Sequence, residues 1–282
     1  MKKLILGSLI LSSTIYASTT LNYAYAIKDF NNSMTKKSGA KIHNFSILHN
    51  FKNHSFNLGY QSDRVKREHS IKKITLPSLD IEKYNLKYLY KLNENIKLKT
   101  SYLKIIDNLA PTDQGKIYGL GGSYNFTKAL SLKADIYNSD YEKFDVRQYD
   151  LAIQKAFKID NTKLKIIGFV KKIDIHGDKY ASYTFKKKDY LTKGIKLVAN
   201  HQGYIGSVAT FFGKRAFTVL DDGTKVQHHA MEQDKTYILS VGKKFKEFDI
   251  FLKYSFQNGK ELPENKEDVD TKVMSIAFSY RF

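Results

Sequence analysis

Lysines on one face of two predicted neighbouring strands are the residues whose type and spacing most suggest chemistry. Lys83 and Lys87 precede a short turn at residues 92–95, and Lys97 and Lys99 follow it. We expect Lys87 to lie directly opposite Lys99. Like charges opposed across a strand pair repel one another, and the repulsion grows in a low-dielectric medium. The cluster is therefore tolerable only on a wet surface, where it would concentrate anions.

Other charged residues have the same parity in their own predicted strands and should share this wet face. The alternative is that any wet face tolerates charge in a lysine-rich chain, without selecting for anions. The residues predicted to line the wet face are Lys83, Lys87, Lys97, Lys99, Lys133, Asp135, Asp150, Lys165, Lys171, Lys196, Lys253 and Arg281.

The eight histidines offer little support for catalysis. A serine–histidine pair must lie within hydrogen-bonding reach, and His43 and Ser46, three residues apart, cannot share a strand face. His228 and His229 lie near Glu232 and Asp234, but their spacing matches no familiar metal site, so we interpret them as solvated loop residues. The chain has no cysteine, which excludes thiol catalysis and thiolate metal ligation. We predict no enzyme activity and no cofactor or metal, with a barrel enzyme as a minor alternative.

The elements that position these residues are predicted to be strands, because apolar residues recur with a period of two. We count 14 segments, although 12 or 16 strands are also compatible with the pattern. They cover residues 19–28, 41–51, 56–65, 81–91, 96–106, 116–126, 130–139, 148–158, 163–173, 190–200, 204–215, 235–245, 248–257 and 271–282.

Short and long connections alternate between these segments. In an up-and-down sheet, this places all the short turns at one end. Outer-membrane β-barrels have even strand numbers, short periplasmic turns and long external loops. The sequence therefore predicts an all-β, antiparallel, membrane-spanning barrel. A secreted β-sandwich is the alternative, but its loops would not alternate so regularly.

The ends of the chain fit export. Residues 1–17 combine two lysines, an apolar stretch and Ala17, as in a cleaved signal peptide, which leaves a barrel over residues 18–282. The formal net charge of +19 could suggest nucleic acid, but the lysines are spread along the whole chain and form no basic module.

The predicted lumen is wide enough for water. Fourteen tilted strands give a backbone radius of about 14 Å. The connection 216–234 is the longest and is the best candidate to fold inward. Ile167 and Phe169 are also expected to point inward, whereas strand 204–215 is apolar on both faces and cannot be assigned.

The last strand, VMSIAFSYRF, resembles the terminal strand of Gram-negative outer-membrane β-barrels. Phe278, Tyr280 and Phe282 form an apolar row that ends on an aromatic residue. The resemblance implies recognition by the barrel-assembly machinery, with help from periplasmic chaperones. The strand number and length resemble the small monomeric porins of outer-membrane porin G type.

These features together predict an outer-membrane porin that passes small hydrophilic, preferentially anionic solutes. Its partners would be membrane lipids, lipopolysaccharide and small anions, and a monomer is favoured. The alternative is a non-transport barrel, structural or adhesive, that presents the loops at 66–80, 174–189 and 216–234.

Overall fold

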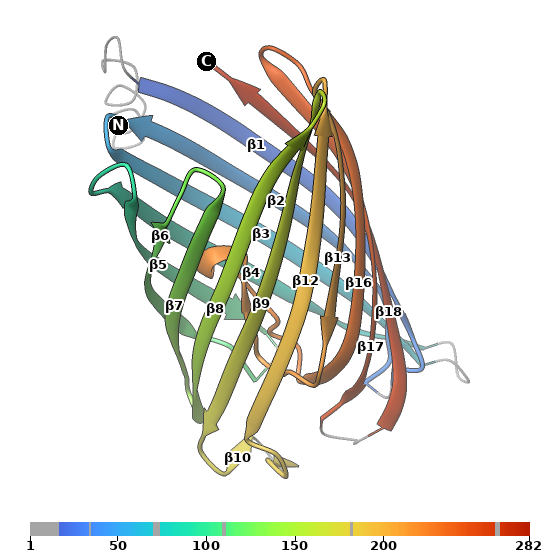
Figure 1. Ribbon diagram of the computed structural model, residues 1–282. Helices are drawn as coiled ribbons and strands as arrows, with labels where there is room; N and C mark the ends of the chain where they lie inside the picture. The colour runs from blue at the N-terminus through green and yellow to red at the C-terminus, as the bar shows by residue number, and fades with distance from the viewer. Residues whose placement is uncertain (1–16, 34, 70–73, 109–110, 181–182, 263–265) are drawn as a thin grey trace, which may run out of the picture.

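The computed structural model describes residues 17–33, 35–69, 74–108, 111–180, 183–262 and 266–282. The predicted signal peptide, apart from Ala17, lies outside the described residues. The chain forms one closed antiparallel barrel of 14 strands, as predicted (Figure 1). The barrel strands are β1 (Ala17–Asn31), β2 (Lys37–Phe51), β3 (His54–His69), β4 (Ile74–Lys91), β5 (Ile96–Asp107), β6 (Lys116–Asn125), β7 (Leu130–Tyr141), β8 (Phe144–Ile159), β9 (Thr162–His176), β12 (Asp189–His201), β13 (Tyr204–Phe212), β16 (Met231–Lys244), β17 (Phe248–Glu261) and β18 (Lys266–Arg281).

The connections separate into two ends of the barrel. The short turns at 52–53, 92–95, 126–129, 160–161, 202–203 and 245–247 form what we call the turn end, and the opposite end is the loop end. Two small hairpins lie in the loop-end connections: β10 (Lys179–Tyr180) with β11 (Tyr183–Thr184), and β14 (Val219–Leu220) with β15 (Lys225–Val226). No helix among the described residues is long and apolar enough to span a membrane.

Several predicted loops at the loop end are largely strand. Strands β3 and β4 run into the segment 66–80, and the connection between β7 and β8 shrinks to residues 142–143. The periodicity missed these extensions because the polarity of the two faces is inverted there. Outward-facing residues such as Asp145 and Arg147 are exposed and polar, whereas inward-facing Phe144 and Val146 are buried and apolar, so the lipid-facing apolar row stops although the backbone ladder continues.

Pairing of β1 with β18 closes the barrel. Leu21 lies opposite Tyr280, and Tyr23 lies opposite Phe278. The pairing leaves no free sheet edge on which another chain could add. Phe278, Tyr280 and Phe282 all point outward and are at least 42% exposed.

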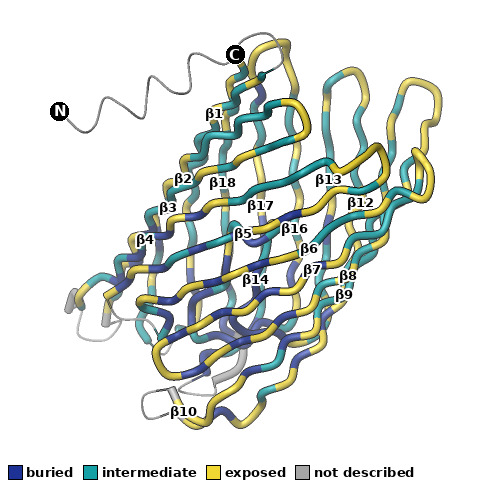
Figure 2. Tube along the Cα trace, turned by 90° about the vertical axis from the view of Figure 1, so that its left-hand side faces the viewer, coloured by how far each residue is buried: buried dark blue, intermediate teal, exposed yellow. Residues whose placement is uncertain are grey.

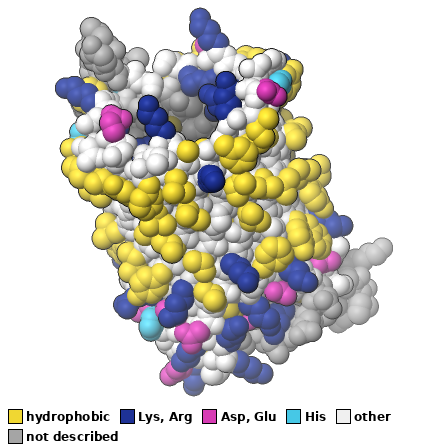
Figure 3. All heavy atoms as spheres, in the orientation of Figure 1, with side chains coloured by type: hydrophobic (Ala, Val, Ile, Leu, Met, Phe, Trp, Pro, Cys, Tyr) yellow, Lys and Arg dark blue, Asp and Glu magenta, His cyan; other side chains and the backbone are white. Residues whose placement is uncertain are grey.

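The outer wall carries a broad apolar belt. Figure 3 shows hydrophobic side chains banding the surface, with charged side chains beyond them toward the loop end. The band includes Leu120, Leu151, Leu239 and Met274, which are between 47% and 65% exposed. So much exposed apolar surface on every strand is the pattern of a wall that faces lipid.

The inner wall changes character from one end to the other. Buried residues concentrate toward the loop end (Figure 2). There, inward-facing apolar side chains such as Leu103, Ile105 and Val146 belong to one core cluster together with Phe217 and Val219 from the connection between β13 and β16. The turn end is hollowed in the space-filling view (Figure 3). The barrel is therefore filled by side chains at one end and open at the other.

One predicted register is wrong. Lys87 pairs with Ser101, and Lys99 pairs with Leu89, so Lys87 and Lys99 are not directly opposed. The strand pairing starts two residues away from the predicted position, because the Asn93 side chain accepts hydrogen bonds from the backbone of Asn95 and Ile96 and shapes the turn. A shift of two residues preserves side-chain parity, so both lysines still point inward.

In other hairpins Asp150 lies opposite Lys171, and Ser240 lies opposite Lys253. The unassigned strand β13 turns Val208 outward, opposite Leu239 of β16. Its odd-numbered residues therefore point inward, and Phe211 packs on the inward-facing Phe169 of β9, with 4.8 Å between ring centroids.

Candidate functional site in the barrel lumen

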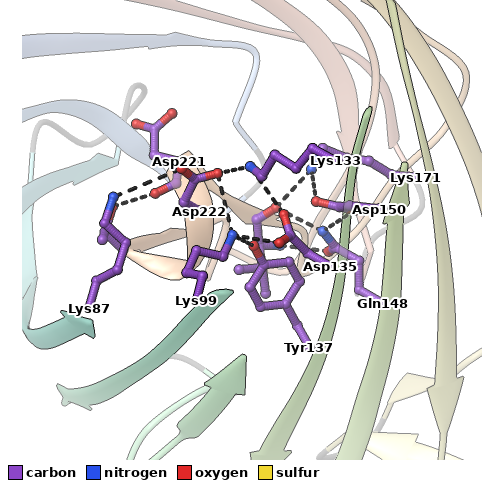
Figure 4. Close-up of polar contacts among 12 residues, drawn as sticks. Lys87, Lys99, Lys133, Asp135, Tyr137, Gln148, Asp150, Lys171, Asp221 and Asp222 are labelled. Atoms are coloured by element: carbon purple, nitrogen blue, oxygen red, sulfur yellow. Dashed lines mark hydrogen bonds and ion pairs between the residues drawn. The ribbon is translucent and has the colours of Figure 1, made fainter. Parts of the chain in front are cut away.

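A belt of alternating charges crosses the inner wall on strands β4 to β9 (Figure 4). Lys99 Nζ lies 2.7 Å from Asp135 Oδ1 and donates a hydrogen bond to the Tyr137 hydroxyl at 3.1 Å. Lys133 Nζ lies 3.1 Å from the other Asp135 oxygen, and Lys171 pairs with Asp150. The predicted lysines are thus brought together, but with carboxylates between them.

The connection between β13 and β16 folds into the barrel and completes this belt. Its single 3₁₀ turn, η1 (Asp221–Gly223), carries Asp222 to the lysines (Figure 4). The Asp222 carboxylate pairs with Lys133, lies 3.5 Å from Lys99 and lies 3.9 Å from Lys87. The sequence predicted that this loop turns inward, but it did not identify Asp222 as the residue that binds the lysines.

A second set of contacts fixes the loop to the wall. The Gln148 side chain on β8 both donates to and accepts from the backbone of Val219, at 2.9 and 2.8 Å. At the base of the loop, Arg215 is 1% exposed, and its guanidinium donates to Gln233 at 2.9 Å and lies over the Phe211 ring. The segment from Ala216 to Ala230, which we call the inner loop, is therefore held at its base and at its tip.

The tip of the inner loop requires a glycine. Gly223 has φ +88°, and a Cβ there would clash with Ser101 Oγ on β5. Asp221 and Asp222 also have positive φ, which aspartate tolerates better than most residues. This backbone turns two carboxylates in opposite directions: Asp222 toward β4 to β7, and Asp221 toward Lys225 at 2.8 Å.

The lumen on the other side of the inner loop is wet and basic. Lys196 on β12 and Lys253 on β17 point inward but remain exposed to solvent. The positive charge of Lys225, with Lys253 and Lys196 nearby, holds the pKa of Asp221 below its ordinary value. Among the described residues, Lys196 and Lys253 form no ion pair, so this side of the lumen keeps an excess of positive charge.

More inward-facing basic residues lie near the turn end. Lys97 is exposed and Lys165 is half-buried, and no ion pair joins either to a described residue. Arg281 is paired instead: its guanidinium contacts both oxygens of Asp249, at 2.7 and 3.1 Å. The predicted wet-face residues therefore form three groups. The lysines near Asp222 are paired with carboxylates, whereas Lys196 and Lys253 are paired with no described residue. Lys97, Lys165 and Arg281 form the third group, near the turn end.

Lys83 lies apart from all these groups. It is 3% exposed, and its Nζ lies 2.9 Å from Asp63. Both residues line a cavity of about 190 Å³ between the inner loop and strands β1 to β4 and β16 to β18. Lys28 and Lys225 line the same cavity, and neither was singled out in the sequence.

His228 and His229 also line this cavity, so their interpretation as solvated loop residues is wrong. They are 4% and 9% exposed, because the inner loop carries them into the barrel. Burial, assisted by the charges of nearby lysines, lowers the pKa of both histidines well below its ordinary value. Within the described part of the chain, no group of three or more histidine, aspartate and glutamate side chains is placed to share a metal ion.

Solved structures share this architecture. The chain is similar to a bacterial polysaccharide outer membrane secretin (9% identity, 95% of this chain and 98% of that chain, TM-score 0.58). It is also similar to the CymD monoaromatic hydrocarbon channel (10% identity, 95% and 89%, TM-score 0.58) and to a TodX deltaS2S3 mutant monoaromatic hydrocarbon channel (10% identity, 95% and 91%, TM-score 0.56). At such identities the likeness shows a shared fold alone.

No protein-family profile and no curated protein matches the sequence. The similarity thus concerns the barrel, and no pore residue can be transferred from a relative.

Proposed function

We propose that the protein is an outer-membrane channel for small hydrophilic solutes, with a preference for anions, and that the inner loop forms its constriction. One observation carries the proposal: lysines that point into the lumen are exposed to solvent inside a wall whose outer face is apolar. Charged side chains need water or a partner, so their exposure indicates a hydrated interior. A barrel of 14 strands is wide enough to hold that water.

The preference for anions follows from the distribution of charge. Asp135, Asp150 and Asp222 neutralise lysines on one side of the lumen only. Lys196 and Lys253 on the other side, and Lys97 at the turn end, form no ion pair with a described residue. Their positive charge is therefore not neutralised by a neighbouring carboxylate. Rings of lysine favour anion passage in pores, and a solute that passes the inner loop on its open side would meet these lysines.

Measurement of the reversal potential in planar bilayers tests this proposal. Under a KCl gradient, we expect discrete channel openings with chloride more permeant than potassium. Replacing both Lys196 and Lys253 with glutamate should move the selectivity toward potassium, because both lysines are exposed in the lumen. A matched pair on the outer wall, Lys172→Glu with Lys193→Glu, should leave it unchanged. Potassium preference in the unmodified protein would contradict the proposed selectivity.

A non-transport barrel remains the second candidate, and the apolar packing at the loop end favours it. Leu103, Ile105, Val146 and Ile173, all on strands of the wall, belong to one core cluster there. A barrel sealed by this packing would present its loops without conducting. The two candidates differ in one respect: removal of the inner loop opens a channel but cannot open a permanently sealed wall.

The outer wall suggests how the barrel is oriented in its membrane. Just beyond the apolar belt, Lys104 lies directly opposite Lys116. Directly opposed like charges destabilise a sheet unless anions lie between them. The phosphates of lipopolysaccharide would supply such anions, which would place the loop end at the cell surface and the turn end in the periplasm.

We therefore expect lipopolysaccharide to stabilise the purified barrel against heat through this surface. Replacing Lys104 and Lys116 with glutamine should remove much of that stabilisation, measured as the shift in unfolding temperature when lipopolysaccharide is added. Lys155→Gln, on the outer face near the turn end, is the matched control and should keep the full shift. An equal shift in all three proteins would show that the opposed lysines do not bind lipid phosphate.

A further inference from the structure

We propose that the cavity behind the inner loop is a binding site for a small hydroxylated monoanion, such as a 2-hydroxy acid. The inference rests on the proposed function, because it names a solute class for the same lumen, but its site is separate from the Asp222 belt. The cavity is formed by residues from the inner loop and from seven strands of the wall that come from both ends of the sequence.

The charge of the cavity calls for an anion. Three lysines line it, Lys28, Lys83 and Lys225, against one carboxylate, Asp63. Asp63 is already occupied, since it pairs with Lys83 and accepts a hydrogen bond from Gln61 at 2.7 Å. Lys225 is paired with Asp221, which approaches from the other side of the loop.

Lys28 is the lysine left to bind a ligand. Its ammonium lies 4.6 Å from the centre of the Phe30 ring, and it forms no ion pair with any described residue. A carboxylate is the natural partner for such an ammonium, because charge-assisted hydrogen bonds are the strongest that side chains make. The Phe30 ring faces this ammonium in a cation–π contact, and Lys28 itself lines the cavity.

The neutral groups of the cavity call for hydroxyl groups on the same ligand. Three buried polar atoms, one amide oxygen and two imidazole nitrogens, have no hydrogen-bond partner: Gln227 Oε1, His228 Nε2 and His229 Nδ1. The other nitrogen of His228 lies 3.5 Å from the Val226 carbonyl oxygen. A proton on that nitrogen leaves Nε2 as an acceptor, since a neutral imidazole has one donor and one acceptor. Acceptors in a buried site are satisfied by a ligand that donates, as a hydroxyl group does.

The size of the cavity limits the ligand to a few heavy atoms. Its volume is about 190 Å³, and a cavity of about 150 Å³ holds a benzene molecule. A three-carbon hydroxy acid is of this size, whereas an oligosaccharide is not. Lactate therefore combines the carboxylate for Lys28, a hydroxyl group that can donate to one of the histidine or glutamine acceptors, and the right volume.

Titration calorimetry on the purified full-length barrel tests the site with three matched solutes. We expect L-lactate to bind, propionate, which lacks the hydroxyl group, to bind about tenfold more weakly, and propane-1,2-diol, which lacks the charge, to give no measurable heat. Equal binding of lactate and propionate would overturn the role of the histidine and glutamine acceptors. Absence of lactate binding at millimolar concentration would overturn the site.

Variants then locate the binding within the molecule. Lys28→Met keeps the length of the side chain and should weaken lactate binding about tenfold, whereas Lys172→Met on the outer wall should leave it unchanged. If Lys28→Met does not fold, the comparison of lactate, propionate and propane-1,2-diol on the unmodified protein still tests whether the site binds a hydroxylated monoanion. The assay involves no transport: binding without conduction would refute the channel and retain the site, and conduction without binding would do the reverse.

Discussion

Replacing residues 216–230 with a short Gly-Ser turn should raise single-channel conductance about threefold or more, because the inner loop folds into the lumen and fills part of its cross-section. The replacement leaves the base of the loop intact. Arg215 and Gln233 exchange two backbone hydrogen bonds of 2.9 and 2.8 Å, so β13 and β16 remain joined there. Among the described residues, the hydrogen-bond ladders that close the wall include no residue of the inner loop.

A variant with the same loop length distinguishes the effect of the loop's volume on conductance from the effect of its two carboxylates. Asp221→Asn with Asp222→Asn keeps the size and shape of both side chains but removes the ion pairs to Lys133, Lys99 and Lys225. We expect a smaller rise in conductance and more frequent transitions between current levels, because Gln148 still binds Val219. A folded loop-replacement variant with unchanged conductance would show that the inner loop is not the constriction.

The fold was predictable because a barrel wall repeats one simple rule. Each strand alternates lipid-facing and inward-facing residues, so Tyr88 and Lys87 already identify their faces. The wrong register of the turn before Ile96 did not change which face each side chain was assigned to, since a shift of two residues keeps parity. The turn itself was harder to predict, because it depends on hydrogen bonds from a single asparagine side chain.

The site was only half predictable, for a physical reason. Lys99, Lys133 and Asp135 lie on strands and follow the parity rule. Asp222 and His228 lie in a loop whose path is set by contacts distant in sequence, such as the 71 residues that separate Gln148 from Val219. No local periodicity encodes such contacts. The largely apolar segment 216–220, AFTVL, was the available signal, because a loop that carries Phe217 and Val219 is unsuited to solvent.

The structure also changes the meaning of the lysine cluster. From the sequence, Lys87 and Lys99 formed an unopposed positive stripe. In the folded chain they hold the inner loop through Asp222, and the free positive charge lies at Lys196 and Lys253. Reversing the charge of Lys99 would therefore displace the loop and alter the width of the lumen together with its selectivity, which is why the exposed lysines are the better probes.

A single introduced cysteine can show whether water passes through the lumen. The chain has no cysteine of its own, so Lys253→Cys creates one thiol, which points inward from β17 at a position exposed to solvent. A charged, membrane-impermeant methanethiosulfonate can reach it only through the barrel. The reagent is added to one compartment of a bilayer at a time, and modification is followed as a stepwise change of current.

The most direct test of the account is the accessibility of this introduced thiol from each side, in the Lys253→Cys variant with the inner loop present and replaced. We predict fast modification from the turn end in both proteins, and slow modification from the loop end that becomes fast once residues 216–230 are replaced. That result would establish a hydrated passage with the inner loop as its constriction. Modification from the turn end alone, even after the loop is replaced, would contradict the account and show a barrel sealed by its own wall.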